Sequence, residues 1–340
     1  MAPSRVVEST GTTPLASWLA RDPVRSLGAG RLHLPFLTKV LAAARALSVQ
    51  VHPSAEQARI GFESEIRSGV PDTQRCYRDS NAKHELLVAL SPVEALCGFR
   101  SDSEVSARLS GVPGAARGLE RQGRQDPLAK ALFEQLQHLS AAERASTCAE
   151  LATFASSDGS REAEWVGRLL AEHPGDPLAM APLFLNPVVL EPGQALVVRP
   201  GTLHSYVSGM GVEVMTRSDN VIRGGLTQKH VDGDELMRVT ESFAQPAEII
   251  RPQAIGADSL ELCYATGTRE FVVRTLELEA RHSVARAGGQ VTVLLCVEGE
   301  VTADGVPLLQ GEAALVPADL AGYQLTGSSR SSRVFEVSSG

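Results

Sequence analysis

The hydrophobic periodicity of this chain changes after Pro174, and that change limits its fold more than any other feature. Between residues 92 and 173, apolar residues recur at helical spacing, as at Leu128, Leu132 and Leu136. Beyond Pro174, short β-rich runs alternate with Gly and Pro turns, which is typical of a barrel or a sandwich. The sequence therefore predicts a mainly β protein that carries an α-helical domain.

Local signals place some elements within this frame. Ser54, Ser91 and Ser140 are each followed three positions later by Gln or Glu, which is the pattern of a helix-capping box. We expect helices to begin at these positions, and a strand at residues 47–52, where apolar and polar residues alternate. The Gly- and Arg-rich stretch 111–125 is expected to be a loop within the helical domain.

Two strand-like segments resemble each other. Residues 193–200 are Gly-Gln-Ala-Leu-Val-Val-Arg-Pro, and residues 311–317 are Gly-Glu-Ala-Ala-Leu-Val-Pro. The first copy continues to His204, whereas the second continues to Tyr323 without a His. The simplest interpretation is two similar β modules, of which only one carries a metal ligand. Chance similarity of two strands is the alternative.

The composition argues against several classes of function. The chain of 340 residues has a net charge of −8, and we see no basic stripe of the kind that nucleic-acid binders carry. No apolar run reaches the roughly 18 residues that span a bilayer, and the N-terminal residues lack the apolar segment of a signal peptide. The five Cys are scattered and odd in number. We therefore expect a cytoplasmic protein with free thiols, without nucleic-acid or membrane partners.

Polar residues occur at i, i+2 spacing in three segments, and such residues point to the same side of a strand. Burying them without partners would cost roughly 1–3 kcal/mol each. The three sets are Ser48, Gln50 and His52; Lys83 and Glu85; and His204 and Tyr206.

Four of these residues, Gln50, His52, Glu85 and His204, would supply two nitrogen and two oxygen ligands. Zinc accepts such ligands in near-tetrahedral geometry, and the absence of thiolate suits a catalytic site. Gln is an uncommon zinc ligand, however, and hydrogen-bonded, partly buried imidazoles are the alternative for both His residues. Spacing alone does not decide between these interpretations.

Charged residues also gather between residues 213 and 229, beside a Gly pair. They form either a solvated turn or acid–base and phosphate-binding groups on a loop near the mouth of a barrel. The charged residues are Glu213, Arg217, Asp219, Arg223 and Lys229, and Asn220 lies among them.

Two motifs are specific in combination: Gln-Val-His-Pro at 50–53 and Ser-Asp-Asn-Val-Ile-Arg-Gly-Gly-Leu at 218–226. Together with residues 34–41 and 90–100, they resemble type I mannose-6-phosphate isomerases, also called phosphomannose isomerases, of the cupin superfamily. The resemblance covers nearly the whole chain. It implies two cupin-like β-barrels, or jelly rolls, plus a helical insertion. The implied domains are 1–90 and 176–245 for the metal-binding barrel, 91–175 for the helical domain and 246–340 for a metal-free barrel.

The resemblance also implies the composition of the site. One Zn²⁺ per chain would be held by Gln50, His52, Glu85 and His204. Catalytic roles fall to Lys83, Glu213, Asp219 and Arg223, and substrate-binding roles to Lys39, Ser48, Tyr206 and Lys229. Asp219, Glu213 and Lys83 are all candidates for the proton-transfer base, and the sequence does not choose among them. Arg223 would stabilise an enediolate oxygen, because guanidinium stays charged.

The implied activity is zinc-dependent interconversion of D-mannose 6-phosphate and D-fructose 6-phosphate through a cis-enediol. Such an enzyme would serve carbohydrate metabolism, either GDP-mannose biosynthesis or mannose catabolism. Its partner would be a small-molecule sugar phosphate, and we expect a monomer.

Two departures from the family pattern favour an alternative, a catalytically impaired paralogue that binds sugar phosphate. Family members usually begin earlier, with a strand and an acidic-aromatic segment, so either the start of this chain is misassigned or cut, or the protein lacks a strand. The family usually has Asn-His-Lys-Pro-Glu where residues 81–85 are Asn-Ala-Lys-His-Glu. Ala82 thus replaces the usual His, and His84 is expected to face away from Lys83. A third hypothesis, an iron-dependent cupin redox enzyme, is disfavoured because the segment after His204 lacks a second His.

Overall fold

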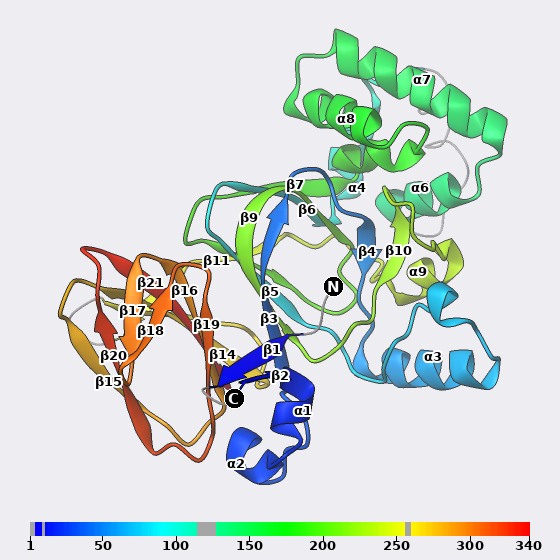
Figure 1. Ribbon diagram of the computed structural model, residues 1–340. Helices are drawn as coiled ribbons and strands as arrows, with labels where there is room; N and C mark the ends of the chain where they lie inside the picture. Colours follow the sequence, from blue (N-terminus) through cyan, green and yellow to red (C-terminus); the bar gives the residue numbers. More distant parts are fainter. Residues whose placement is uncertain (1–3, 9–10, 114–126, 256–259) are drawn as a thin grey trace. The chain divides into compact units, whose positions relative to one another are not determined.

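The computed structural model describes residues 4–8, 11–113, 127–255 and 260–340, and these residues form two compact units. One unit comprises the described residues from Lys39 to Ile250. The other comprises the described residues up to Thr38 together with those from Arg251 to Gly340. Figure 1 labels most of the helices and strands of both units. Most of the loop expected at 111–125 lies outside the described residues.

The unit from Lys39 to Ile250 is built on an antiparallel sheet, to which its described residues contribute nine strands. The strand β9 joins two parts of this sheet, because its first half pairs with β6 and its second half with β5. This exchange of partners curls the sheet into a nearly closed barrel. The strands are β3 (Phe36–Ala43), β4 (Val49–Val51), β5 (Glu85–Ala89), β6 (Val93–Phe99), β7 (Leu185–Leu190), β8 (Ala195–Val198), β9 (His204–Thr216), β10 (Ile222–Gly225) and β11 (Glu248–Ile250).

Gly209 lies where β9 changes its partner. Its φ is 107°, and a Cβ at this position would come within 2.3 Å of the carbonyl oxygen of Pro92. Only glycine tolerates both the conformation and the close approach of the backbone. The bend in β9 therefore depends on this residue, and it allows one strand to carry site residues at both ends.

The helices expected before Pro174 are present except for the one expected at Ser91. In α6 the residues Leu128, Leu132 and Leu136 form the buried face, as their spacing predicted. The capping boxes expected at Ser54 and Ser140 are confirmed, since each Ser hydroxyl accepts the backbone N–H of the residue three positions on. The helices of this unit are α3 (Ala55–Arg67), α4 (Asp102–Leu109), α6 (Leu128–Gln137), α7 (Ala141–Ser157), α8 (Arg161–Glu172) and α9 (Gly233–Val239), with short 3₁₀ helices η1 (Asp72–Gln74) and η3 (Pro177–Leu183).

The helix expected to begin at Ser91 was wrong, because residues 93–99 form β6. Proline is acceptable both at the first turn of a helix and at the start of a strand, so Pro92 did not discriminate between them. Val93, Ala95 and Cys97 alternate into an apolar cluster of the barrel, which decides in favour of the strand.

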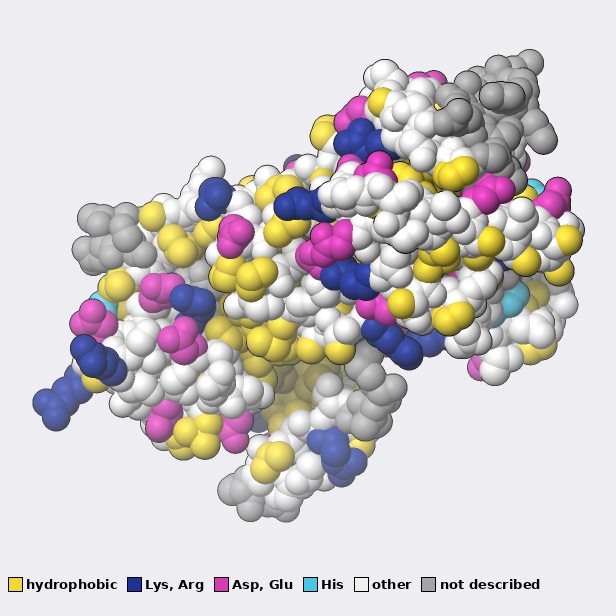
Figure 2. Space-filling model, turned by 90° about the horizontal axis from the view of Figure 1, so that it is seen from above, with side chains coloured by type: hydrophobic (Ala, Val, Ile, Leu, Met, Phe, Trp, Pro, Cys, Tyr) yellow, Lys and Arg dark blue, Asp and Glu magenta, His cyan; other side chains and the backbone are white. Residues whose placement is uncertain are grey.

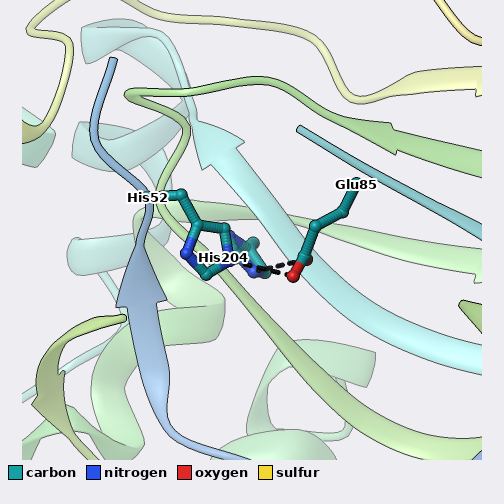
Figure 3. Close-up of side chains that lie close together, drawn as sticks. All are labelled: His52, Glu85 and His204. Carbon is teal, nitrogen blue, oxygen red and sulfur yellow. Dashed lines mark ion pairs between the residues drawn. The ribbon is translucent and has the colours of Figure 1, made fainter. Parts of the chain in front are cut away.

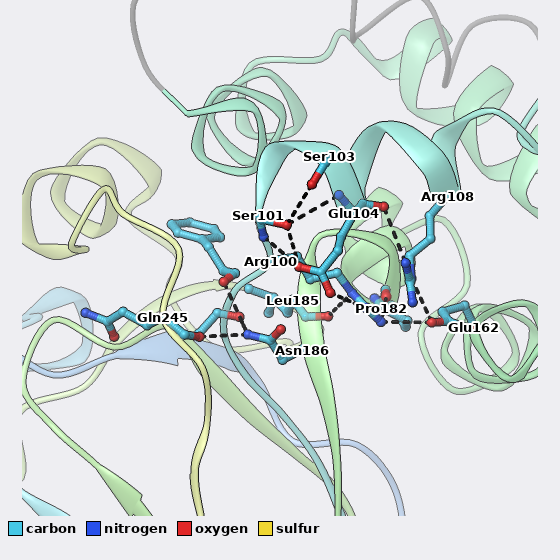
Figure 4. Close-up of polar contacts among 12 residues, drawn as sticks. Arg100, Ser101, Ser103, Glu104, Arg108, Glu162, Pro182, Leu185, Asn186 and Gln245 are labelled. Carbon is cyan, nitrogen blue, oxygen red and sulfur yellow. Dashed lines mark hydrogen bonds and ion pairs between the residues drawn. The ribbon is translucent and has the colours of Figure 1, made fainter.

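Arg100 connects the end of β6 to the helical region (Figure 4). Its guanidinium donates to the carbonyl oxygens of Leu185 at 2.9 Å and Pro182 at 3.3 Å, and to Oε1 of Glu162 at 2.9 Å. Arg108 of α4 donates to the same carboxylate at 2.8 Å. Arg100 is 5% exposed, so its charge is almost fully removed from water and matched inside the protein.

The second unit contains two sheets around an apolar cluster that includes Leu276, Leu294, Val301 and Leu325. This arrangement agrees with the expected second jelly roll. One sheet is formed by β12 (Gln253–Ile255), β13 (Glu261–Tyr264), β14 (Phe271–Leu278), β21 (Ser332–Ser339), β16 (Thr292–Glu298) and β19 (Ala313–Val316). The other is formed by β15 (Ser283–Ala287), β20 (Gly322–Gly327), β17 (Glu300–Ala303) and β18 (Val306–Leu309).

The repeat detected in the sequence corresponds to equivalent strands. Gly193 precedes β8 with a φ of 85°, and Gly311 precedes β19 with a φ of 89°. The next strand begins at His204 in the first copy, whereas in the second copy it contains Tyr323. The resemblance between these segments therefore reflects a shared local structure.

The N-terminal residues pack on the second unit. They comprise β1 (Arg5–Glu8), β2 (Gly11–Pro14), α1 (Leu15–Leu19) and α2 (Pro23–Leu27). Leu27 packs in a cluster with Val291, and the side chains of Arg25 and Asp319 form an ion pair at 2.9 Å. The sequence had placed residues 1–90 together in the first barrel, whereas this packing groups the described residues up to Thr38 with the C-terminal strands.

Acidic and basic side chains are interspersed over the face of the molecule seen in Figure 2. Within the described part of the chain, no helix is both long and apolar enough to cross a membrane.

Candidate metal centre and active site

Three candidate residues lie side by side on neighbouring strands. Gln50 on β4 is paired with His204 at the start of β9 and with Arg223 on β10. Residues directly opposite each other on adjacent strands point to the same face of the sheet. Segments that are distant along the chain therefore present an amide, an imidazole and a guanidinium in one row.

Glu85, at the start of β5, brings a carboxylate to two imidazoles. Its oxygens lie 3.2 Å from Nε2 of His52 and 3.6 Å from Nε2 of His204, and Figure 3 shows both rings directed at the carboxylate. All three side chains are buried, and one ligand atom from each lies within 4.8 Å of the others. The amide nitrogen of Gln50 lies 3.3 Å from Nε2 of His204. The four predicted ligands are thus brought together.

Backbone carbonyl groups fix the orientation of both rings. Nδ1 of His52 lies 2.8 Å from the carbonyl oxygen of Asn220, and Nδ1 of His204 lies 3.0 Å from that of Thr202. Because a carbonyl oxygen only accepts, each Nδ1 carries the proton and each Nε2 turns a lone pair toward Glu85. Nε2 of His52 and Oε2 of Glu85 are buried without a hydrogen-bond partner. Nitrogen lone pairs that face a carboxylate in this way are the arrangement expected where one cation binds to all of these groups.

The charge states of these groups also suit a metal ion. Burial, assisted by the positive charge of Lys83, lowers the pKa of His52 to about 4, so its imidazole is neutral at pH 7. Burial opposes the ionisation of Glu85, but the positive charge of Lys83 favours it, and the pKa of Glu85 lies well below its usual range. Neutral imidazole and ionised carboxylate are the forms that bind metal ions.

Two lysines and a second carboxylate surround this cluster. Nζ of Lys83 lies 2.9 Å from Oε1 of Glu85, and Lys39 forms an ion pair with Glu213. Glu213 is paired with Leu87, two residues beyond Glu85 on β5, so both carboxylates project from the same face. Burial, together with the negative charge of Glu85, raises the pKa of Glu213.

The remaining candidates divide into two groups. The ring of Tyr206 meets that of His204 edge-on at 5.8 Å, and the hydroxyl of Ser48 donates to the amide oxygen of Gln50 at 3.0 Å. By contrast, Asp219 and Lys229 are exposed, and no hydrogen bond or ion pair between described residues joins either side chain to the cluster. These two predicted residues lie outside the contacts of the candidate metal centre.

Comparisons with known proteins identify the family. The model of the family described as phosphomannose isomerase type I, catalytic domain, matches residues 3–102. The mannose-6-phosphate isomerase of Shigella flexneri is 35% identical over 89% of this chain and 79% of its own length. The chain belongs to the mannose-6-phosphate isomerase family. The mannose-6-phosphate isomerase of Escherichia coli is 33% identical over the same shares of the two chains.

Solved structures of mannose-6-phosphate isomerases share the fold. A zinc-bound mannose 6-phosphate isomerase superimposes with a TM-score of 0.89 at 30% identity, covering 99% of this chain and 88% of that chain. A mutant of phosphomannose isomerase from Salmonella typhimurium gives a TM-score of 0.89 at 31% identity, with the same coverage. Membership of this family confirms the resemblance drawn from the motifs, and the superpositions confirm the expected fold class.

Asn220 supports the site, although the sequence places it only in the cluster between residues 213 and 229 and assigns it no role of its own. Its amide oxygen accepts the backbone N–H groups of Arg78 at 2.6 Å and Asp79 at 3.1 Å. Its amide nitrogen donates to the carbonyl oxygens of Asp79 and Asn81, both at 2.9 Å. The side chain is fully buried. The one sequence signal for its role was that Asn220 is uncharged while several of its neighbours within 217–223 are charged. A buried amide needs several hydrogen-bond partners, so such a residue can hold other parts of the chain in place.

Proposed function

We propose that this chain is a zinc-dependent mannose-6-phosphate isomerase that interconverts D-mannose 6-phosphate and D-fructose 6-phosphate. Membership of the family supports the substrate. The proposal depends on the buried Nε2 of His52, which faces a carboxylate oxygen of Glu85 at 3.2 Å while its own ring proton is engaged by Asn220. This arrangement is repulsive unless a cation lies between the two groups.

One Zn²⁺ per chain would be held by His52, Glu85, His204 and Gln50. The amide oxygen of Gln50 has a second lone pair beyond the one that accepts from Ser48. When bound, zinc would supply Lewis-acid stabilisation of the negative charge that develops on the sugar oxygens. Lys83, at 2.9 Å from Glu85, would keep that carboxylate ionised.

We favour Glu213 as the group that moves a proton between C1 and C2 of the open-chain sugar. Its pKa is raised by burial, which brings a carboxylate closer to the working pH of a general base. Lys83 is engaged by Glu85, and Asp219 is exposed outside the cluster. Arg223, half-buried in the same row as Gln50, would stabilise the oxygen of the cis-enediol.

The substrate phosphate requires cationic or hydrogen-bonding groups away from the reacting carbons. Lys229 is exposed just after β10 and suits this role. Ser48, Tyr206 and Lys39 are the other residues we assign to substrate binding, with Lys39 nearest the reacting carbons because it pairs with Glu213.

The decisive experiment measures bound zinc and isomerisation on the same purified protein. We expect about one zinc per chain and conversion of mannose 6-phosphate to fructose 6-phosphate in a coupled assay. Glu85→Ala should abolish both, since removing a buried ligand leaves two imidazoles without a cation. Glu94→Ala is the matched control, because Glu94 lies on β6, the next strand along the chain, and pairs with Arg168 instead.

Each failure has a different meaning. Full zinc content without turnover would favour the alternative, an impaired paralogue that binds sugar phosphate, for which Ala82 is the sequence argument. Protein that folds but binds no zinc would contradict the proposal, because the proposed mechanism requires the metal ion. We further propose that the enzyme acts as a cytoplasmic monomer, which light scattering and cell fractionation test.

A further inference from the structure

A second group of metal-ligating side chains lies outside the centre described above. Cys76, His230 and Asp232 each place one ligand atom within 4.8 Å of the others, and the described residues contain only this group and the His52 cluster. Cys76 follows η1, His230 follows β10, and Asp232 caps the N-terminus of α9. The trio thus comes from three separate segments of one unit.

The surroundings of the trio attract a cation. The backbone N–H groups of Cys76 and Tyr77 donate to the two oxygens of Glu65, which fixes that carboxylate beside the loop. Burial, followed by the negative charges of Asp232, Glu65 and Glu235, raises the pKa of Cys76 to about 12, whereas the smaller effect of the positive charge of Arg223 is in the opposite direction. The same charges that disfavour a bare thiolate favour a positive ion next to it.

The ligand atoms are open to coordination. Oδ1 of Asp232 accepts the backbone N–H of Glu235 at 2.9 Å, and its second oxygen remains for another partner. His230 is exposed, so its ring can be approached from solvent, whereas Cys76 is 4% exposed and forms the inner wall. Thiolate, imidazole and carboxylate together are a ligand set for zinc or another thiophilic divalent cation.

We propose that Cys76, His230 and Asp232 form a second cation site, for a thiophilic divalent ion such as zinc or cadmium. Binding forms a bond from sulfur to the ion and releases the thiol proton to solvent. The backbone N–H of Asp232 donates to the carbonyl oxygen of Arg223 at 3.2 Å, so the ion lies close to the strand that carries this arginine.

Cadmium distinguishes this site from the first one, because the His52 cluster contains no thiolate. We expect full-length protein loaded with a single equivalent of zinc, which fills the His52 cluster first, to bind one further equivalent of cadmium, with an ultraviolet thiolate-to-cadmium charge-transfer band. Cys76→Ser should abolish the band. Cys148→Ser should retain it, since Cys148 lies on α7 outside the group.

His230→Ala keeps the test decisive even where Cys76→Ser fails to fold, because His230 is exposed and its truncation leaves the core intact. We expect this substitution to weaken cadmium binding by at least about tenfold. Even the loss of a residue that only hydrogen-bonds to a metal ligand lowers metal affinity by about 10–100-fold, and His230 is proposed as a ligand itself. A band that persists in Cys76→Ser, or unchanged affinity in His230→Ala, overturns the proposal. Neither readout uses isomerase activity, so the result is separate from that of the proposed function.

Discussion

The backbone carbonyl oxygen of Asn220 lies 2.8 Å from Nδ1 of His52 and thereby fixes which nitrogen of that ring is free to bind a metal ion. The side chain of the same residue holds the backbone of residues 78–81, the segment that leads to Lys83 and Glu85. One residue therefore sets the orientation of one metal ligand and the approach of another.

Asn220→Ala should lower zinc affinity by about 10–100-fold, because the backbone that orients His52 and the loop before Glu85 both lose their support. Calorimetric titration of the apoprotein with zinc would measure this loss. Asn186→Ala is the control: Asn186 also donates to several backbone carbonyls, those of Gly98 and Gln245 among them, but it orients none of the predicted ligands. Equal zinc affinity in both variants would mean that Asn220 has only a structural role.

Arg223→Ala should lower kcat by about 10²–10³, which is the usual effect of removing a donor to a developing oxyanion, while the zinc content stays unchanged. Steady-state kinetics combined with metal analysis separates the two effects. Arg217→Ala is the matched control, since Arg217 is exposed in the same segment. A parallel loss of zinc and of turnover would make Arg223 a support of the metal centre.

Glu213→Gln should lower kcat by about 10²–10⁴ and remove the acid limb of the pH profile of kcat. A general base acts when it is ionised, and the pKa of Glu213 is raised above the usual value by burial. Activity in the unmodified enzyme should therefore rise with pH through a pKa higher than that of an exposed Glu. Glu94→Gln should keep this limb. An unchanged midpoint in Glu213→Gln would place the base elsewhere, with Lys83 next.

Local sequence signals predicted the fold where one physical effect dominated. The boxes at Ser54 and Ser140 and the apolar face of Leu128, Leu132 and Leu136 are short-range patterns, and all are present. Ser91 was misleading because its box competes with strand pairing of residues 93–99 against β7 and β9, contacts far apart in sequence. The packing of Leu27 against Val291 is equally long-range and left no local pattern to detect.

The candidate site was predictable as to its residue types but not its contacts. The i, i+2 spacing of Gln50 and His52 reflected a strand face, and the family motifs implied the ligand set. Nothing in the spacing indicated that Lys39 pairs with Glu213, or that Asp219 is exposed while Asn220 beside it is buried. Which residue of a loop is buried depends on the groups that contact it. For Asn220 these groups are in the backbone of residues 78–81.

Arg100 and Arg108 both form an ion pair with the carboxylate of Glu162, but they differ in burial. Substituting each in turn therefore shows how much burial changes the contribution of an ion pair to stability. The side chain of Arg100 is 5% exposed and that of Arg108 is 32% exposed. Arg100→Ala should reduce the free energy of unfolding by about 3 kcal/mol, because the carbonyl oxygens of Leu185 and Pro182 lose their donor in a buried place. Arg108→Ala should cost less, about 1 kcal/mol, because the side chain of Arg108 is partly accessible to solvent and water can replace part of its interaction.

The measurement needs a probe within the helical region, and Trp165 provides one because it is buried on α8. Urea unfolding followed by its fluorescence, in a Trp18→Phe background, reports on this region alone, since the chain contains only these two Trp residues. Similar losses in the two variants would show that burial of Arg100 contributes nothing beyond its charge pair. The opposite order would mean that α4, which carries Arg108, is the principal attachment of the helical region to the barrel.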